Sequence, residues 1–171
     1  MITIRSENPN DYSQISDVIY SAFEQKNEVR LVINLRASPD FISELSLVAI
    51  LNNLIIGHIL FSKIIITSEK AEFPALALAP LAVRPEFQNQ GIGSKLVEKG
   101  LEECKRLNHK IVIVLGHPKF YPKFGFKPAY DFGVIAPFDV PNESFLILEL
   151  TSGALKGVSG IVEYPLAFDE G

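Results

Sequence analysis

The chain contains very little cysteine and no excess of positive charge, and both absences narrow its function. Cys104 is the single cysteine among 171 residues, so an internal disulfide is excluded and a reducing compartment is expected. The formal net charge is −4, which argues against nonspecific DNA or RNA binding as the main task. We therefore expect no nucleic-acid partner.

A membrane span and a secretory signal find no support in the sequence either. Residues 47–66 are rich in Leu and Ile, but Asn52, Asn53, His58 and Lys63 interrupt them. Two asparagines between apolar runs are more typical of a hairpin turn than of a membrane span. The first eight residues have neither a basic start nor a long apolar stretch, as a signal peptide would. We expect no membrane association and a cytoplasmic location.

The most informative segment that is present joins an apolar run to a helix. The run ends at Val83, Pro85 interrupts it, and Gln88-x-x-Gly91-x-Gly93 leads directly into a helical pattern. Backbone N–H groups at a helix N-terminus lack partners within the helix and carry partial positive charge. Because two glycines have no side chains, a phosphate can approach these groups closely. The segment therefore predicts a site for a pyrophosphate-bearing cofactor.

The residues after this loop support that prediction. Apolar positions from Ile92 to Leu107 recur with a period near 3.6, which indicates an amphipathic helix. The run 111–115 is apolar and mostly β-branched, as is typical of a buried strand. Strand, loop, helix and strand form a βαβ unit, in which ligands bind beyond the carboxyl end of the first strand. Cys104 lies on the apolar helix face, so we interpret it as a core residue and not as a nucleophile.

Two other types of glycine loop do not fit. A Walker A loop requires Gly-Lys-Ser/Thr, whereas Gly93 is followed by Ser94 and then Lys95. A dinucleotide fingerprint requires a third glycine where Leu96 stands, and an acidic residue at the end of the next strand, where this chain has His117. These mismatches exclude ATP-type and NAD-type loops.

The segment Val83-x-Pro85-x-x-Gln88-x-x-Gly91-x-Gly93 resembles the acetyl-CoA signature of the GNAT superfamily of N-acyltransferases. A second segment, Phe120-Tyr-Pro-Lys-Phe-Gly-Phe126, is similar to that family's Tyr-x-x-x-Gly-Phe block. The resemblance covers about residues 2–150 and is strongest over 76–128. Within it, residues 115–126 are most similar to a bacterial subgroup of mostly uncharacterised N-acetyltransferases, which usually has an acidic residue where this chain has His117.

Local patterns alone leave the fold class open between α/β and α+β. They indicate two helices, the first after Asn8-Pro9 and the second over about 28–37, and strands over about 46–51, 54–66, 74–83 and 145–150. The resemblance implies a mixed, mostly antiparallel sheet flanked by helices and splayed between its fourth and fifth strands. We interpret residues 1–171 as a single N-acetyltransferase domain in which residues 151–171 form an irregular C-terminal tail.

The resemblance also implies that acetyl-CoA, the acyl donor, lies in the cleft of the splayed sheet. The end of the strand contacts the pantetheine arm, the loop amides hold the pyrophosphate, and an aromatic residue lines the channel. The cofactor-binding residues are then Leu81, Ala82, Val83, Gln88, Asn89, Gln90, Gly91, Ile92, Gly93, Ser94 and Phe120. Arg84, Lys119 and Lys123 either neutralise CoA phosphates or are solvated. No cluster of His, Cys and carboxylate residues indicates a metal site.

Tyr121 occupies the family's tyrosine position and is the implied general acid that protonates the departing CoA sulfur. Its alternative is simple packing among neighbouring aromatic rings. The base stays open: Glu28 either receives the acceptor or merely suits a helix dipole, and His117 lies beside the cleft and can titrate near neutral pH. Water or a carbonyl is a third route for the proton. His58 is interpreted as a hydrogen-bonded structural residue.

The expected function is that of an N-acetyltransferase. It moves an acetyl group from acetyl-CoA to a primary amine of a small molecule or a protein, by direct transfer in a ternary complex. A non-catalytic acyl-CoA-binding or sensing module of the same fold is the alternative, and a longer acyl chain stays open. The sequence does not identify the acceptor, and it allows a monomer or a homodimer.

Overall fold

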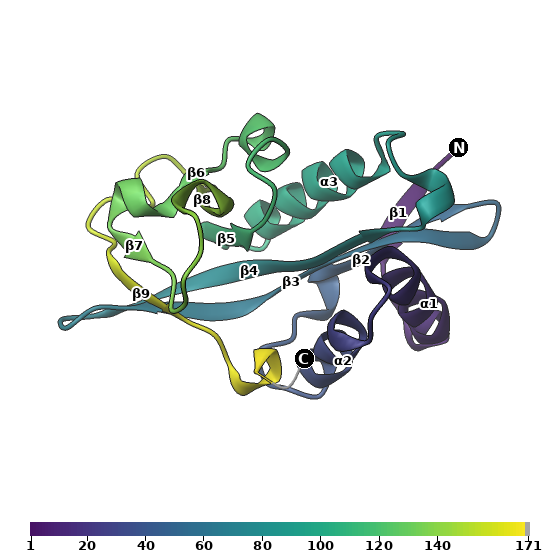
Figure 1. The fold of residues 1–171 in the computed structure, drawn as a ribbon, viewed down its shortest axis with the longest axis horizontal. Coiled ribbons are helices and arrows are strands. Elements are labelled where there is room, and N and C mark those ends of the chain that lie inside the picture. Colours follow the sequence, from purple (N-terminus) through teal and green to yellow (C-terminus); the bar gives the residue numbers. More distant parts are fainter. Residues whose placement is uncertain (170–171) are drawn as a thin grey trace.

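The computed structural model describes residues 1–169 and contains a nine-stranded sheet with helices on both faces (Figure 1). The helices are α1 (Tyr12–Phe23), α2 (Asn27–Arg36) and α3 (Ile92–Arg106). The strands are β1 (Thr3–Ser6), β2 (Ser46–Leu51), β3 (Leu54–Thr67), β4 (Glu72–Val83), β5 (Ile111–Leu115), β6 (Lys127–Pro128), β7 (Val134–Ile135), β8 (Phe145–Glu149) and β9 (Gly160–Glu163).

The sheet is mixed and mostly antiparallel, as the sequence predicts. Its strand order is β1-β2-β3-β4-β5-β8-β6, and β9 pairs with both β3 and β7. The two parallel pairs are β4 with β5 and β7 with β9. Helix α3 is the crossover between β4 and β5, because parallel neighbours cannot be joined by a tight hairpin. The expected βαβ unit is therefore present.

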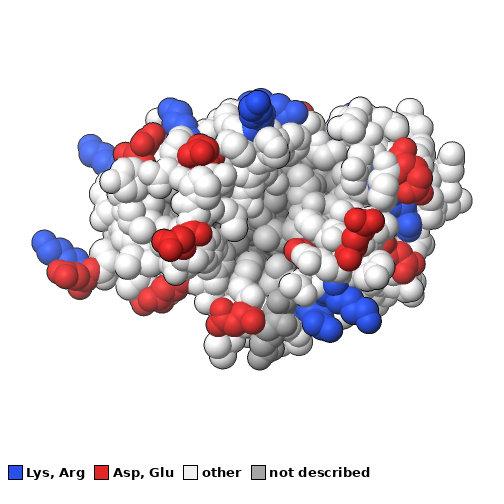
Figure 2. Space-filling model, in the orientation of Figure 1, with Lys and Arg blue, Asp and Glu red and all other residues white. Residues whose placement is uncertain are grey.

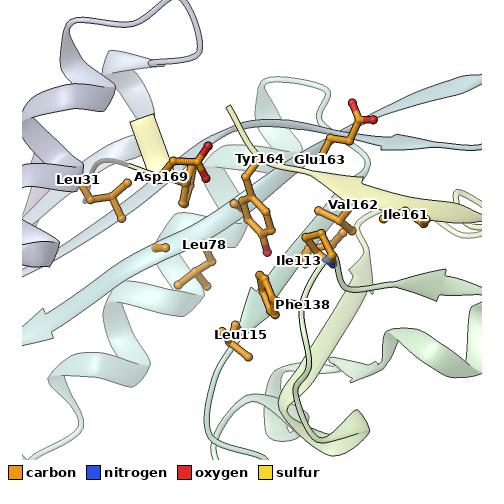
Figure 3. A pocket seen from close by; sticks show the side chains of 14 residues that line it. Leu31, Leu78, Ile113, Leu115, Phe138, Ile161, Val162, Glu163, Tyr164 and Asp169 are labelled. Atoms are coloured by element: carbon orange, nitrogen blue, oxygen red, sulfur yellow. The ribbon is translucent and has the colours of Figure 1, made fainter. Parts of the chain in front are cut away.

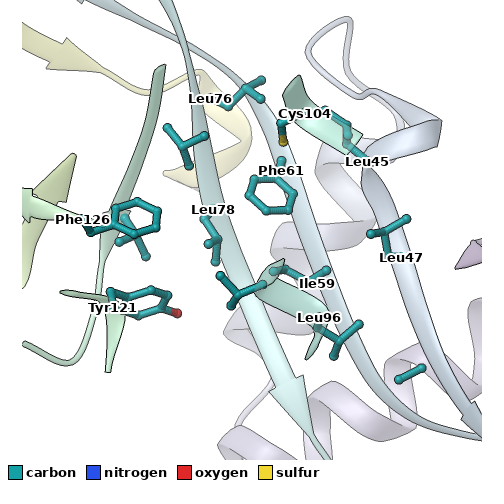
Figure 4. Close-up of a cluster of buried hydrophobic side chains, with 14 of the residues drawn as sticks. Leu45, Leu47, Ile59, Phe61, Leu76, Leu78, Leu96, Cys104, Tyr121 and Phe126 are labelled. Carbon is teal, nitrogen blue, oxygen red and sulfur yellow. The ribbon is translucent and has the colours of Figure 1, made fainter. Parts of the chain in front are cut away.

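The helices divide between the two faces of the sheet. Figure 1 shows α3 on one face and α1 with α2 on the other. A large apolar cluster lies under α3, and Phe61 of β3 is fully buried within it (Figure 4). A Cβ atom at Gly100 would collide with the Phe61 ring. The missing side chain at this position therefore lets α3 lie directly on the sheet.

Two local signals in the sequence are confirmed by the structure. Asn52 and Asn53 have φ values of 50° and 64° and form the turn between β2 and β3, the left-handed geometry that two-residue hairpins require. Asn8 caps the 3₁₀ turn that precedes α1, with its side chain accepting from the N–H of Asn10. The Asp11 carboxylate accepts from the N–H of Asn8 at 2.8 Å, which completes a capping box.

The prediction of an irregular tail over residues 151–171 is wrong for the segment that forms β9. Strand β3 is longer than β2, so its far end, Ile65–Thr67, has no partner on that side. Strand β9 fills this edge in antiparallel register, with Ile66 opposite Val162. Unpaired backbone groups at a sheet edge favour such pairing. Val162 and Leu155 consequently become buried core residues. Residues 170 and 171 lie outside the described residues.

A buried polar network ties α2 to the first three strands. The Arg36 guanidinium donates to both carboxylate oxygens of Glu7, from Nε at 2.8 Å and from Nη2 at 2.9 Å. The Ser46 hydroxyl donates to Glu7 Oε1 at 2.5 Å, and its oxygen lies 2.9 Å from His58 Nε2. Since the single hydroxyl proton of Ser46 is used on Glu7, His58 Nε2 carries a proton and donates it to Ser46.

His58 is the residue of this network that makes folding sensitive to pH. Its side chain is fully buried, and its Nδ1 has no hydrogen-bond partner among the described residues. Burial, with a smaller contribution from the charge of Arg36, lowers the pKa of His58 to about 3. The ring is therefore neutral in the folded protein. This confirms His58 as a hydrogen-bonded structural residue.

The network leads to a prediction about acid stability. The pKa of His58 is lower when folded than when unfolded, so the unfolded chain takes up the proton first as the pH falls. The stability that neutral His58 provides is complete above about pH 6.5 and is lost progressively between about pH 6.5 and 3. As the pH is lowered through this range, the free energy of unfolding, measured with urea, is expected to fall faster in the wild type than in His58→Gln. The difference in slope is up to about 1.4 kcal/mol per pH unit.

His117→Gln provides the matched control, because His117 is exposed and its removal is expected to leave the acid slope as it is in the wild type. Parallel stability curves for the wild type and His58→Gln between pH 6.5 and 4 would contradict the assignment.

Candidate active site

Strands β4 and β5 are paired over a short distance and then separate. Their register joins Leu76 to Val112 and Ala77 to Ile113, whereas β4 continues as far as Val83. The register between β3 and β4 shifts opposite Leu60, where Ala79 and Pro80 form a β-bulge in β4. A bulge bends its strand. The sheet is thus splayed between β4 and β5, as the family resemblance implies.

The N-terminus of α3 lies at the end of β4 and carries no side-chain cap. Gly91 is its N-cap residue, with φ of 85°, and Asn89 two residues earlier has φ of 63°. A residue with a Cβ atom adopts this left-handed geometry at a cost that glycine does not have. The N–H groups of the first helical turn have no partner within the helix and are free to bind an anion.

A cavity of about 480 Å³ lies between this helix end, the end of β4 and the segment after β5. The predicted cofactor-binding residues that line it are Leu81, Val83, Gln88, Asn89, Gly91, Gly93, Ser94 and Phe120. Lys123 also lines it, with Nζ 4.4 Å from the centroid of the Phe120 ring, and brings a positive charge. Ala22, Phe23 and Phe87 complete the lining. Ala22 and Phe23 belong to α1, far away in the sequence, and no local pattern indicated them.

Three other predicted cofactor-binding residues do not line this cavity. Ala82 and Ile92 are each 2% exposed and pack in the core, so only their backbone groups are available at the site. The Gln90 side chain donates to the carbonyl of Glu86 at 3.2 Å. Gln88, in contrast, lines the cavity and donates to the carbonyl of Val83 at 2.9 Å, which fastens the loop to the end of β4.

Arg84 and Lys119 also lie outside the lining. Arg84 Nε donates to the carbonyl of Ile55 at 2.7 Å, so this side chain fastens the end of β4 to the β2–β3 hairpin. Lys119 is exposed. Of the three basic residues that the sequence offered for CoA phosphates, the structure brings Lys123 to the cavity.

Tyr121 lies in the apolar cluster beneath the splayed strands. It is 7% exposed, and its ring packs edge-on against those of Phe120 and Phe126, with centroids 4.9 and 5.6 Å away. A Cβ atom at Gly116 would collide with this ring, so the glycine makes room for the tyrosine. The hydroxyl points toward β4 (Figure 4). Burial raises the pKa of Tyr121 to about 12, which keeps the phenol protonated.

The two candidate bases lie apart from the cofactor cavity. Glu28 accepts hydrogen bonds from Gln25 Nε2 at 2.9 and 3.1 Å, and it lies one turn before Leu31 on the same side of α2. His117 is exposed, and its Nδ1 accepts from the N–H of Lys119 at 3.3 Å. Neither residue lines the 480 Å³ cavity, and Tyr121 is not among its lining residues either but lies buried beside Phe120. The structure therefore does not bring the three predicted catalytic residues together at this cavity.

A second, larger cavity of about 690 Å³ lies where β4 and β5 separate, toward α2 and β9 (Figure 3). It is lined by Leu31, Ala77, Leu78, Ala79, Ile113, Leu115, Pro137, Phe138, Ile161, Val162, Glu163, Tyr164, Phe168 and Asp169. No local pattern in the sequence indicated this cavity, because its walls come from segments that long-range strand pairing brings together. The face drawn in Figure 2 has a hollow at its centre, and most of its charged side chains lie around the periphery.

Among residues 1–169, no group of three or more His, Cys, Asp or Glu side chains is placed to hold a metal ion. Likewise, none of the helices found in this range is long and apolar enough to cross a bilayer.

The chain is similar to known proteins along most of its length. Residues 43–128 match the model of the acetyltransferase (GNAT) domain family. The Escherichia coli K12 uncharacterized N-acetyltransferase YjhQ is 37% identical over 142 residues, which are 82% of this chain and 78% of that protein. The uncharacterized N-acetyltransferase YhbS of the same strain is 33% identical over 162 residues, 94% and 95% of the two chains.

Solved structures of N-acetyltransferases also resemble this chain. The crystal structure of E. coli YhbS in complex with CoA superposes with a TM-score of 0.91 at 30% identity, covering 98% of this chain and 92% of that one. A GNAT family acetyltransferase from Brucella melitensis in complex with acetyl-CoA gives a TM-score of 0.81 at 30% identity, covering 99% of each chain. The loop, the splayed sheet and these matches agree, and the chain belongs to the GNAT family of N-acetyltransferases.

Proposed function

We propose that this chain, as a single domain, transfers the acetyl group of acetyl-CoA directly to a primary amine in a ternary complex. The observation that carries the proposal is the cavity shared by the uncapped N-terminus of α3, the end of β4 and Phe120. Relatives with 30% identity and TM-scores of 0.91 and 0.81 bind CoA and acetyl-CoA, which supports the same ligand here.

The shape and charge of the cavity suit the two ends of this ligand. The first N–H groups of α3 and the Lys123 ammonium provide positive charge for the pyrophosphate. Beyond Ala77, β4 has no β5 backbone to pair with, so its polar groups are available to the amide groups of the pantetheine arm. A backbone N–H at Leu81 or Ala82 then polarises the thioester carbonyl, since Pro80 has no N–H to offer.

The transfer proceeds by attack of the neutral amine nitrogen on the thioester carbonyl carbon. The C–N bond forms, the C–S bond breaks, and the thiolate leaves with the bonding electron pair. The thiolate takes a proton from the Tyr121 phenol, and the nitrogen gives its extra proton to water. The resulting phenolate then takes a proton from water, which restores the phenol. Burial raises the pKa of Tyr121 to about 12. A thiol that leaves into the same apolar surroundings has its pKa raised as well. The pKa values of the phenol, which gives the proton, and of the thiol, which receives it, therefore stay closer together.

The incoming ammonium must lose one proton before its nitrogen can attack. We assign no single residue of the chain as the general base for this step. Glu28 and His117 remain proposals for this step, together with water. Glu28 has the better position, because it lies on the side of α2 that carries Leu31, a lining residue of the 690 Å³ cavity.

Calorimetric titration with acetyl-CoA, followed by a free-thiol release assay over a panel of amines, tests the proposal. Binding with amine-dependent thiol release is the expected result. Binding without release for any amine would favour the non-catalytic acyl-CoA-sensing module. Absence of binding would overturn the proposed function.

Tyr121→Phe is expected to lower kcat by about 100-fold, within the usual contribution of a general acid, and to leave the Kd of acetyl-CoA unchanged. The change removes the hydroxyl and keeps the ring that packs against Phe120 and Phe126. Steady-state kinetics measures kcat, and calorimetry measures the Kd of acetyl-CoA. Tyr130→Phe is the matched control, because Tyr130 is 60% exposed and lines neither cavity. An unchanged kcat in Tyr121→Phe would remove this residue from the mechanism.

Gly91→Ala is expected to raise the Kd of acetyl-CoA roughly tenfold, about 1.4 kcal/mol, because the added Cβ strains the loop that presents the α3 amides. Gly153→Ala is a closely matched control: the two glycines have φ of 85° and 84°, and a Cβ at either meets nothing within 4 Å. Both variants are expected to lose similar stability in thermal unfolding. Equal Kd values for the two variants would show that the Gly91 loop does not hold the ligand.

A further inference from the structure

We propose that the 690 Å³ cavity between β4, β5 and β9 binds the acceptor, and that this acceptor is a small primary amine with an aromatic or branched apolar body and no anionic group. The inference rests on the proposed function and names its substrate class. It is carried by the position of the cavity, by its apolar walls and by the signs of the charges around it.

The cavity lies where an acceptor must arrive. Ala77, Leu78 and Ala79 of β4 line it, and the cofactor cavity begins at Leu81 on the same strand. Two residues of an extended strand span about 7 Å. The two cavities therefore approach each other along β4 near its bulge, so a thioester seated in the first and an amine seated in the second would lie on either side of this point.

The walls of this cavity favour an apolar body. The rings of Phe138 and Tyr164 are stacked, with centroids 6.1 Å apart and an interplanar angle of 21°. Leu115, Phe138 and Ile161 line the cavity and yet are 51%, 44% and 51% exposed. Exposed large apolar side chains gathered around one concave site mark a ligand site more often than a free surface. The volume also lies within the range typical of small-molecule pockets.

Charge excludes anionic acceptors. Among the described residues that line the cavity, Glu163 and Asp169 are the charged ones, and no Lys or Arg is present. A carboxylate or phosphate on the acceptor would lose its hydration here without gaining a counter-charge. Because both charged lining residues are acidic, an ammonium group is favoured over an anion. Deeper in, the apolar walls lower the pKa of the amine, which favours the neutral form that attacks.

Tyr164 offers the one uncharged polar side chain among the described lining residues. Figure 3 shows its hydroxyl directed toward Ile113 and Phe138, whereas the Glu163 carboxylate points away from the cavity. Burial raises the pKa of Tyr164 to about 12, so the hydroxyl keeps its proton and accepts or donates one hydrogen bond. It thus orients the amine and leaves the surrounding walls to the apolar body.

The test compares acceptors that differ in one property each. Thiol release with acetyl-CoA is measured for 2-phenylethylamine, for L-phenylalanine, which adds a carboxylate to the same body, and for ethanolamine and spermidine, which lack the aromatic body. We expect kcat/KM for 2-phenylethylamine to exceed that for L-phenylalanine at least about 100-fold and that for the two polar amines at least about tenfold.

A variant of the cavity wall provides a second measurement. Phe138→Ala is expected to raise the KM for 2-phenylethylamine roughly tenfold and to leave the Kd of acetyl-CoA unchanged. Tyr130→Ala, which removes an exposed aromatic ring outside both cavities, is the matched control and is expected to change neither value. Saturation-transfer NMR of 2-phenylethylamine with the CoA-loaded protein reports binding independently of turnover, and the signal is expected to weaken in Phe138→Ala.

The outcomes separate this inference from the proposed function. Absence of acetyl-CoA binding in calorimetry overturns the proposed function itself. Acetyl-CoA binding with equal or better turnover of L-phenylalanine or spermidine overturns the acceptor class and leaves the function intact. An NMR signal that is absent, or that is the same in the wild type and Phe138→Ala, overturns the assignment of the cavity.

Discussion

The early separation of β4 from β5 is the constraint on which the rest of the site depends. Parallel pairing ends at Ala77 and Ile113, and the bulge at Ala79 and Pro80 bends β4 away. The remaining length of β4 then has a free edge inside the molecule. Both cavities adjoin this strand, one at residues 77–79 and the other at residues 81–83. A fully paired sheet would have neither cavity.

Two glycines adapt the core to this opening. Gly100 lets α3 lie directly on Phe61, and Gly116 leaves the space that the Tyr121 ring fills. Both are close approaches, since an added Cβ would meet an aromatic ring. On the opposite face, the network of Glu7, Arg36 and His58 ties the first strands to α2. The opening is thus bordered on both faces by elements that packing or hydrogen bonds hold in place.

The smaller cavity, which we propose for the cofactor, was largely predictable because most of its lining residues lie close together in the sequence. The strand end, the Gly91–Gly93 loop and the helix follow one another in the sequence, and local rules suffice to interpret them. The strands and helices were predictable for the same reason. The strand β9 was not, because its pairing with the far end of β3 depends on the difference in length between β2 and β3, a property of the assembled sheet. The walls of the larger cavity depend on that same assembly, so the pairing of Phe138 with Tyr164 left no local signal.

The two halves of the site come from different stretches of the chain. The lining of the smaller cavity lies mostly within residues 81–94 and 120–123, inside the range 43–128 that matches the family model. Much of the other wall, from Pro137 to Asp169, lies beyond that range. On the proposed assignment of the two cavities, mutations in the closing segment reshape the acceptor wall without touching the donor loop. Such a division lets descendants of one ancestor keep a common donor and diverge toward different amines, with most of the inherited change confined to the last quarter of the chain.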